Sequence, residues 1–192
     1  IIRSFAEIGY KVQFKLLNAA NYGTPQRRER VIFIGVRENL NVHYPDPTHS
    51  KDGGNLLSQK KWKTVKESID DLKDQEENIE WNHIFTKHNS AFIKKLKNTP
   101  VGQSVFGFSD AFYRNAPDVP SRTVKENHGG VFVHYEKNRV MTPRELARLQ
   151  SFSDDFIFKG SKSQILVQIG NAVPPLLGKA IGTTIAEILD EK

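Results

Sequence analysis

Three polar side chains at alternate positions are the residues best suited to chemistry in this sequence. Gln26, Arg28 and Arg30 lie in a polar segment between two apolar stretches. In extended backbone, alternate side chains share one face, so the amide and the two guanidinium groups are expected to act together. Grouped cations of this kind hold a phosphate or an electron-rich oxygen, or they pair with carboxylates.

The two apolar stretches that flank this segment differ in periodicity. Tyr10–Leu16 alternates apolar and polar residues, which is typical of a strand with one exposed face. Val31–Val36 is continuously apolar and rich in β-branched residues, which indicates a strand buried on both faces. We therefore expect an antiparallel pair of strands joined by a long polar loop, after a short helix that ends at Gly9.

Helix signals occur at four places after this hairpin. Two are capping boxes, each with a threonine followed three residues later by a glutamate, and they precede helices at Val65–Leu72 and from Pro143 onward. The others are a one-sided apolar pattern and a pair of prolines, which indicate helices at Ser90–Leu96 and after Pro174. Residues 98–138 hold turn residues and short β-prone pieces, so this region is expected to be loop-rich and mostly β.

The composition restricts the classes of function. The 192 residues carry 28 lysines and arginines against 22 acidic residues, and the net charge of +6 favours polyanionic partners. There is no cysteine, which excludes disulfides, cysteine-bound zinc and a cysteine nucleophile within these residues. The histidines show no metal-ligand spacing, so no metal site is expected. Because no long apolar run or signal peptide is present, we expect a cytoplasmic protein without a membrane partner.

Three segments resemble conserved blocks of the DNA cytosine-5 methyltransferase family. They read NAANYGTPQRRERVIFIG from residue 18, RVMTPRELARLQ from residue 139 and QIGNAVPP from residue 168. Their order is that of the family, and the long stretch between the first two is where the family carries its variable target recognition region. Pro120-Ser-Arg-Thr-Val124 resembles the end of that region, whereas Ser151 and Ser153 stand where relatives usually have glycine and proline.

The resemblance implies an α/β fold. Part of a Rossmann-like, S-adenosylmethionine-dependent methyltransferase domain, at 1–73 and 161–192, would join a small, irregular, mostly β target recognition domain at 74–160. The family's blocks that bind most of the cofactor and supply the catalytic cysteine and acid lie upstream of residue 18 and are not in this sequence. We therefore expect a fragment that is inactive alone and that works with an N-terminal catalytic half in the same or a separate chain.

The implied function is transfer of a methyl group from S-adenosylmethionine to C5 of a flipped cytosine in a specific sequence of double-stranded DNA, in a bacterial restriction-modification system. Such enzymes add a cysteine thiolate to C6, and the charge that builds on the O2 side needs a cationic donor. By resemblance, Arg30 is the candidate for O2, and Arg28 and Gln26 support the site. The alternative is a basic loop whose arginines pair with carboxylates or bind phosphate.

Two further groups of residues are candidates for contacts. Gly170, Asn171 and Val173 are implied to line the cofactor and target pocket, although Asn171 is equally well explained as the N-cap of the last helix. DNA contacts, to phosphates or to base edges, are expected from a polar run that precedes two glycines: Arg122, Thr123, Lys125, Asn127 and His128. A plain β-hairpin turn is the alternative for this run.

Other interpretations of the whole chain stay open at this point. Arg144 and Arg148 are expected to be structural, orienting the recognition region, rather than phosphate ligands. A non-catalytic DNA-binding protein derived from the same family is the main rival function. An RNA cytosine methyltransferase is less favoured, because the long gap between the first two blocks suits a reader of duplex DNA.

Overall fold

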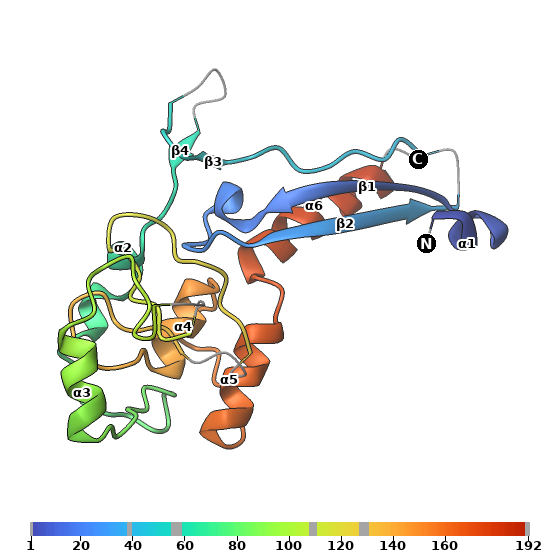
Figure 1. Ribbon diagram of the computed structural model, residues 1–192. Coiled ribbons are helices and arrows are strands. Elements are labelled where there is room, and N and C mark those ends of the chain that lie inside the picture. The colour runs from blue at the N-terminus through green and yellow to red at the C-terminus, as the bar shows by residue number, and fades with distance from the viewer. Residues whose placement is uncertain (1, 38–39, 55–58, 108–110, 127–130, 191–192) are drawn as a thin grey trace.

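The chain forms two lobes, as shown in Figure 1 by a computed structural model that describes residues 2–37, 40–54, 59–107, 111–126 and 131–190. The elongated lobe contains α1 (Ile2–Glu7), β1 (Lys11–Asn18), the 3-10 turn η1 (Ala19–Tyr22), β2 (Glu29–Val36) and α6 (Pro175–Asp190). The rounder lobe contains α2 (Val65–Ile69), η2 (Asp70–Leu72), α3 (Ser90–Lys97), α4 (Pro143–Leu149) and α5 (Lys162–Asn171). Two short parallel strands, β3 (His49–Ser50) and β4 (Lys60–Lys61), lie on the connection between the lobes.

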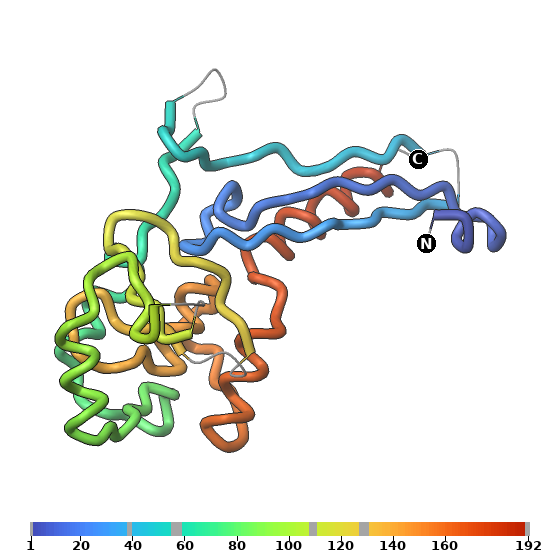
Figure 2. Tube along the Cα trace, viewed as in Figure 1, coloured from blue at the N-terminus to red at the C-terminus, as the bar shows by residue number. Residues whose placement is uncertain are grey.

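The predicted antiparallel hairpin is confirmed, with pairing from Lys11 opposite Val36 to Asn18 opposite Glu29. One face of the hairpin packs on α6 through a buried cluster that includes Leu17 and Leu177. The connection from residue 40 onward runs along the same lobe, as the tube in Figure 2 shows.

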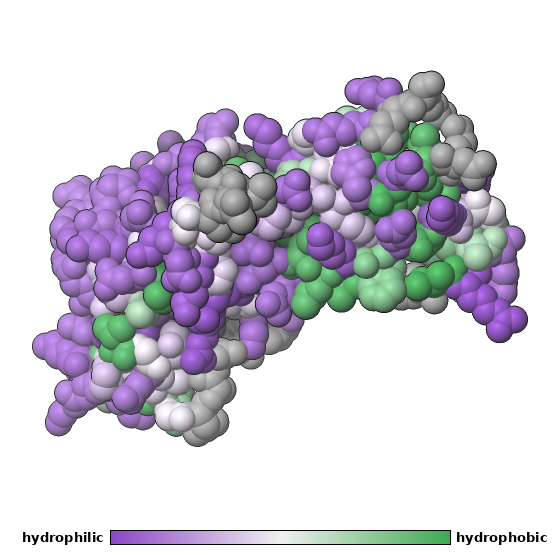
Figure 3. Space-filling view, turned by 90° about the horizontal axis from the view of Figure 1, so that it is seen from above, coloured by the Kyte–Doolittle hydropathy of each residue, from purple (hydrophilic) through white to green (hydrophobic). Residues whose placement is uncertain are grey.

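The other face of the hairpin is apolar and exposed. Phe14 and Leu16 of β1 are each 58% exposed, and Val31 and Phe33 opposite them are 49% and 41% exposed. The expectation that β2 is buried on both faces is therefore wrong for this chain, because Ile34 is the only buried residue of that strand. Seen from above, hydrophobic residues gather over the hairpin lobe, whereas the rounder lobe is mainly hydrophilic on that side (Figure 3).

The predicted capping boxes are confirmed, and the structure contains their hydrogen bonds. In both capping boxes the threonine hydroxyl accepts a hydrogen bond from the N3 backbone and the glutamate accepts one from the N-cap backbone, ahead of α2 and of α4. The α3 helix is capped by the Asn89 side chain, and α1 ends before Gly9, whose φ of +83° suits a glycine.

The recognition region is not mostly β, which corrects the sequence-based expectation. Among the described residues from 98 to 138, pairing is limited to isolated bridges, such as Ser104 with Tyr113 and Arg114 with Val133. Some backbone carbonyl groups in and beside this region are bound by side chains, and others by turn and loop backbone. The Arg114 guanidinium, for example, donates to the carbonyl oxygens of Leu96 and Thr99 and of residues 134 and 137. Turn and loop bonds, together with side-chain hydrogen bonds, satisfy the backbone here without a sheet ladder.

The helix α5 was missed by the sequence analysis, and Asn171 is its last residue rather than the N-cap of α6. A third capping box, formed by Ser161 and Gln164, begins this helix and was the signal that could have revealed it. Prolines do open α6, as predicted. Among the described residues, no single helix is long and apolar enough to cross a membrane, and only α5 and α6 taken as one bent pair pass the same test.

One main hydrophobic core holds the rounder lobe together. It contains Val65 and Ile69 of α2, Leu149 of α4, and Ile165 and Ile169 of α5. The core thus takes residues from all three of the sequence ranges assigned to domains above. The three ranges therefore share one core in this structure.

Arg144 and Arg148 are structural, as expected. Arg144 is fully buried and donates to the carbonyl oxygens of residues 81, 153 and 156. Arg148 binds both carboxylate oxygens of Asp154 and one of Asp71, which ties α4 to the turn after α2. A buried arginine that satisfies several carbonyl groups fixes loop geometry.

Candidate functional site

The polar segment between β1 and β2 is a tight turn followed by an extended stretch. The Asn18 side chain accepts a hydrogen bond from the backbone of Ala20 at 3.1 Å and so starts η1, and Gly23, with φ +86°, ends it. The stretch then pairs with the recognition region, because Arg27 N donates to Ser121 O at 2.9 Å. These contacts set the direction in which the following arginines leave the backbone.

Three residues of the connection between the lobes hold this turn from its outer side, namely Thr48, His49 and Trp62. Thr48 N donates to Asn21 O at 2.9 Å, and the Trp62 indole donates to Asn21 Oδ1 at 3.0 Å. The His49 ring lies so close to Gly23 that a Cβ there would meet it at 2.9 Å. The sequence analysis did not identify these positioning residues, since they lie more than 20 positions from the turn that they hold.

Gln26 and Arg28 are buried and join three segments that are distant in sequence. Gln26 Oε1 accepts from Val124 N at 2.8 Å, and its amide group donates to Leu149 O and to the side chain of Gln150. Arg28 donates to Val124 O at 2.8 Å and to Gly170 O at 2.9 Å. The two side chains therefore connect the hairpin with α5 and with the recognition region.

The Arg28 charge is satisfied mainly by backbone oxygens. Burial, assisted by the nearby Arg30 and opposed by Glu126, lowers the pKa of Arg28 to about 10. The guanidinium stays protonated at neutral pH. Among the described residues its Nε finds no hydrogen-bond partner, which leaves one buried donor that a neighbouring electron-rich group could use.

Arg30 has a different environment, because it is exposed. Its guanidinium donates to the carbonyl oxygen of Glu29 at 2.6 Å. The three alternate side chains thus differ in environment: Gln26 and Arg28 are buried while Arg30 lies at the surface. Arg27, which lies between Gln26 and Arg28 in the alternating pattern, is exposed as well.

An open hollow of about 430 Å³ brings Arg30 together with residues of the recognition region. Its walls include three of the predicted DNA-contact residues, namely Arg122, Thr123 and Lys125. Thr123 Oγ1 donates to Arg27 O at 2.9 Å, and the Arg122 guanidinium stacks on the Tyr113 ring at 3.7 Å from its centroid. Two further predicted residues, Asn127 and His128, lie outside the described residues.

The junction of α5 and α6 borders the buried arginine. Gly170 is buried, its carbonyl accepts from Arg28, and a Cβ on it would lie 2.1 Å from Glu126 N. Gly170 therefore serves the close approach of two backbones. Asn171 and Val173, the latter 57% exposed, face solvent and remain candidates for contact with a bound group.

Ser151, where the sequence analysis expects a departure from the family pattern, follows α4 in a backbone conformation that favours glycine. Its φ is +66°, a conformation that glycine adopts without strain. The hydroxyl accepts from Leu176 N at 3.2 Å and lies 3.4 Å from the Thr24 hydroxyl. The serine thus links the end of α4 to α6 and to the polar loop.

Two solved structures of methyltransferases share the fold of this chain. A protein of an Escherichia coli prophage, assigned as a DNA modification methyltransferase, aligns with a TM-score of 0.74 at 21% identity and covers 98% of this chain and 64% of its own. The Dnmt2 methyltransferase of S. pombe aligns with a TM-score of 0.60 at 15% identity, over 98% of this chain and 61% of its own.

Sequence comparison identifies the family of this chain. The family model for C-5 cytosine-specific DNA methylases matches residues 1–187. Type II methyltransferase M1.HphI of Haemophilus parahaemolyticus is 35% identical, over 98% of this chain and 51% of the relative. Type II methyltransferase M.BsuRI of Bacillus subtilis is 39% identical, over 97% of this chain and 44% of the relative. This chain belongs to the C-5 cytosine-specific DNA methylase family, and it spans about half the length of these relatives.

Proposed function

We propose that this chain is the target-holding and DNA-reading part of a type II DNA cytosine-5 methyltransferase. The whole enzyme transfers a methyl group from S-adenosylmethionine to C5 of a flipped cytosine in double-stranded DNA. The observation that carries the proposal is the hollow in which Arg30 lies beside Arg122, Thr123 and Lys125. A cationic donor next to further cationic and hydroxyl groups suits a base that is held by its polar edge while its phosphates are bound.

The two arginines of the loop take different parts in this proposal. Arg30 is exposed at the hollow, so its guanidinium can reach the O2 atom of a flipped cytosine and stabilise charge that develops there. Arg28 is too deeply buried for that contact, and it acts as a positioning residue through the carbonyl oxygens of Val124 and Gly170. Gln26 assists by fixing the same strand to Val124.

The residues at the α5 and α6 junction fit the edge of a cofactor site. Asn171 presents an amide and Val173 an apolar side chain, both exposed, beside the glycine that Arg28 binds. These groups would hold part of S-adenosylmethionine, which supplies the methyl group when it is bound. Most of that site would belong to the N-terminal catalytic half.

The exposed face of the hairpin supports the need for that half. Phe14, Leu16, Val31 and Phe33 form a continuous apolar surface, and their rings and branches would be costly to leave in water. A partner that completes the sheet and covers this face would remove it from solvent. The N-terminal catalytic half, in the same or a separate chain, is the proposed occupant.

Complementation tests the proposal. These 192 residues alone should transfer no labelled methyl groups to DNA, because they contain no cysteine. When the upstream half is supplied, activity should appear, and Arg30→Ala should lower turnover by about 100-fold while DNA affinity changes much less. Arg37→Ala is the matched control, since Arg37 is an exposed arginine at the opposite end of the hairpin. Equal losses of turnover and of binding in Arg30→Ala would identify a simple phosphate contact and contradict the proposed role.

A further inference from the structure

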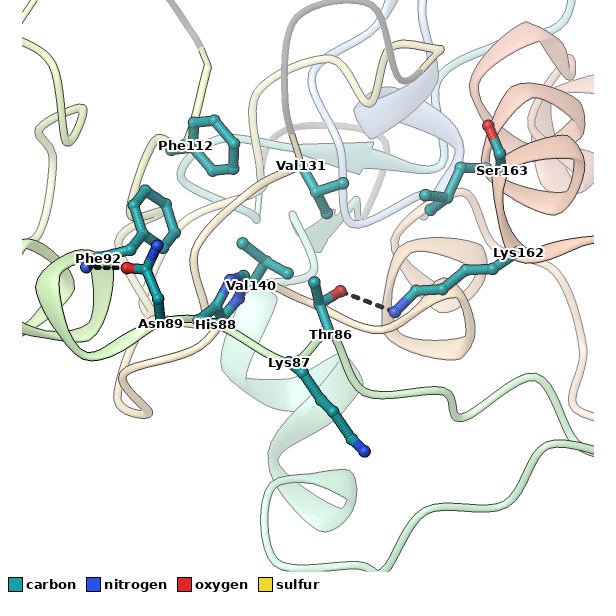
Figure 4. A pocket seen from close by; sticks show the side chains of 11 residues that line it. Thr86, Lys87, His88, Asn89, Phe92, Phe112, Val131, Val140, Lys162 and Ser163 are labelled. Carbon is teal, nitrogen blue, oxygen red and sulfur yellow. Dashed lines mark hydrogen bonds between the residues drawn. The ribbon is translucent and has the colours of Figure 1, made fainter.

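A second cavity lies in the rounder lobe, between the start of α3 and the start of α5 (Figure 4). Its volume is about 570 Å³, which is within the size range of pockets that bind small organic groups. None of its lining residues belongs to the hollow around Arg30. Its walls are apolar and its edge is polar, so it offers two kinds of contact to one ligand.

The apolar wall is largely aromatic. The rings of Phe92 and Phe112 pack edge to face with centroids 5.1 Å apart, and the His88 ring lies 5.0 Å from that of Phe92. Val131, Val140 and Leu166 complete the wall.

Phe112 is held in a strained backbone conformation. Its φ of +52° lies in the left-handed region, which bulky residues rarely adopt. Strain of this kind persists where the surrounding structure needs a side chain in one place, and it clusters at functional sites. The strained backbone presents the Phe112 ring to the cavity.

The polar edge contains two groups with unused bonding capacity. The Lys162 ammonium donates to Thr86 Oγ1 at 2.7 Å, but within the described part of the chain no carboxylate lies within 4.0 Å of it. The Nε2 atom of His88 is buried and has no hydrogen-bond partner among the described residues. Burial lowers the pKa of both groups, which adds to the benefit of an anionic, hydrogen-bonding ligand near them.

We infer that this cavity binds an unstacked nucleotide of the DNA, with its base against Phe92 and Phe112, a base edge at His88 Nε2 and a phosphate at Lys162. The inference rests on the proposed function, and the nucleotide is a second one, distinct from the target cytosine at the Arg30 hollow. Bases that leave the stack are commonly held on aromatic side chains. An apolar side chain of a protein partner would fill the wall but would leave the lysine without an anion and the imidazole without a partner.

Binding of defined nucleotides to the full chain tests this site. The probes are the four deoxynucleoside 5′-monophosphates and the matching deoxynucleosides, followed by NMR shifts of the pocket residues. Removal of the phosphate should weaken binding about 10-fold, and Lys162→Met should weaken nucleotide binding about 10-fold without affecting the nucleosides. Phe92→Leu should weaken both probes about 10-fold. Lys159→Met is the control and should stay within about 2-fold, because Lys159 is exposed and does not line the cavity.

Two duplexes distinguish DNA from a free nucleotide as the source. A duplex with a single-nucleotide bulge should bind about 10-fold more tightly than the fully paired duplex, and Phe92→Leu should remove most of that difference. Equal affinity for the two duplexes would overturn the assignment to DNA, even if free nucleotides bind. No shift of the pocket signals at millimolar nucleotide, or equal effects of Lys159→Met and Lys162→Met, would overturn the site itself. If the complemented enzyme still methylates DNA in those cases, the proposed function stands and only this inference fails.

Discussion

The substitution Gly170→Ala tests how the buried arginine holds the two lobes together. A Cβ on Gly170 would lie 2.1 Å from Glu126 N and 2.3 Å from the Lys125 carbonyl carbon. Both are backbone atoms, so no side chain can rotate away. Ordinary contact begins near 3.4 Å, and the segment at 124–126 must therefore move by about 1.3 Å.

This movement would break the contacts on which the site depends. Arg28 donates to Val124 O and Gly170 O on opposite sides of the contact, at 2.8 and 2.9 Å, and Gln26 accepts from Val124 N. Overpacking costs about 1–3 kcal/mol, and the loss of a hydrogen bond to a charged group costs about 1.5–3 kcal/mol. Alanine gains up to about 1 kcal/mol over glycine within a helix, which only partly offsets the loss. The expected net decrease in the free energy of unfolding is about 1.5–5 kcal/mol.

Urea unfolding of the purified chain measures this decrease. Gly182→Ala in α6 is the matched control, because no heavy atom lies within 4 Å of the added Cβ, and it should raise the free energy of unfolding by about 0.5–1 kcal/mol. In a double-mutant cycle, Gly170→Ala and Arg28→Met should cost less together than the sum of their separate effects. A Gly170→Ala variant within about 1 kcal/mol of the parent would refute the reasoning that this close approach is rigid.

Three other predictions follow from single contacts and charges. Burial lowers the pKa of His134 to about 4, below its unfolded value of about 6.5. The unfolded chain therefore binds more protons than the folded chain between these two pH values. The free energy of unfolding should fall by about 3 kcal/mol as the pH drops through this range. Trp62→Phe removes the bond to Asn21 Oδ1 and should lower the free energy of unfolding in urea by about 1 kcal/mol. Weak, poorly selective binding of the chain to fluorescent duplexes should fall with salt, and Lys125→Met should reduce the slope of log K against log salt by about 0.9.

Each of these has an outcome that would contradict it. His134→Asn should remove most of the pH dependence, and an unchanged pH profile would assign the effect to other groups, such as His83, whose pKa burial also lowers. Trp62→Phe with unchanged stability would show that the hydrogen bond from Trp62 to Asn21 does not stabilise the loop. Tight, salt-insensitive and sequence-specific binding by this chain alone would favour an independent DNA-binding protein over a part of a methyltransferase.

Local features of this protein could be derived from sequence because short-range interactions create them. The capping boxes at Thr64 and Thr142 involve atoms three residues apart, and the structure contains both hydrogen bonds of each box. The hairpin followed from a change of period along the chain, and its pairing was confirmed. The family followed from three ordered motifs, and its match extends over residues 1–187.

Some local expectations failed for reasons that the sequence also contained. Ser161 and Gln164 signal the start of α5. The sequence analysis instead predicted one helix after the two prolines that follow Val173, with Asn171 as its N-cap. The β-prone pieces in the recognition region form only single bridges among the described residues, and a side chain, that of Arg114, binds the carbonyl oxygen of His134 in one of them.

The sequence by itself determined the family, the hairpin and most helix starts, whereas tertiary structure alone decided the environments of the candidate residues. Spacing placed Arg28 and Arg30 on one face, but packing buries the first and exposes the second. The bonds that bury Arg28 reach Val124 and Gly170, which lie 96 and 142 positions away. No periodicity encodes contacts at such separations, because they arise only when the whole core closes and brings distant backbones into register.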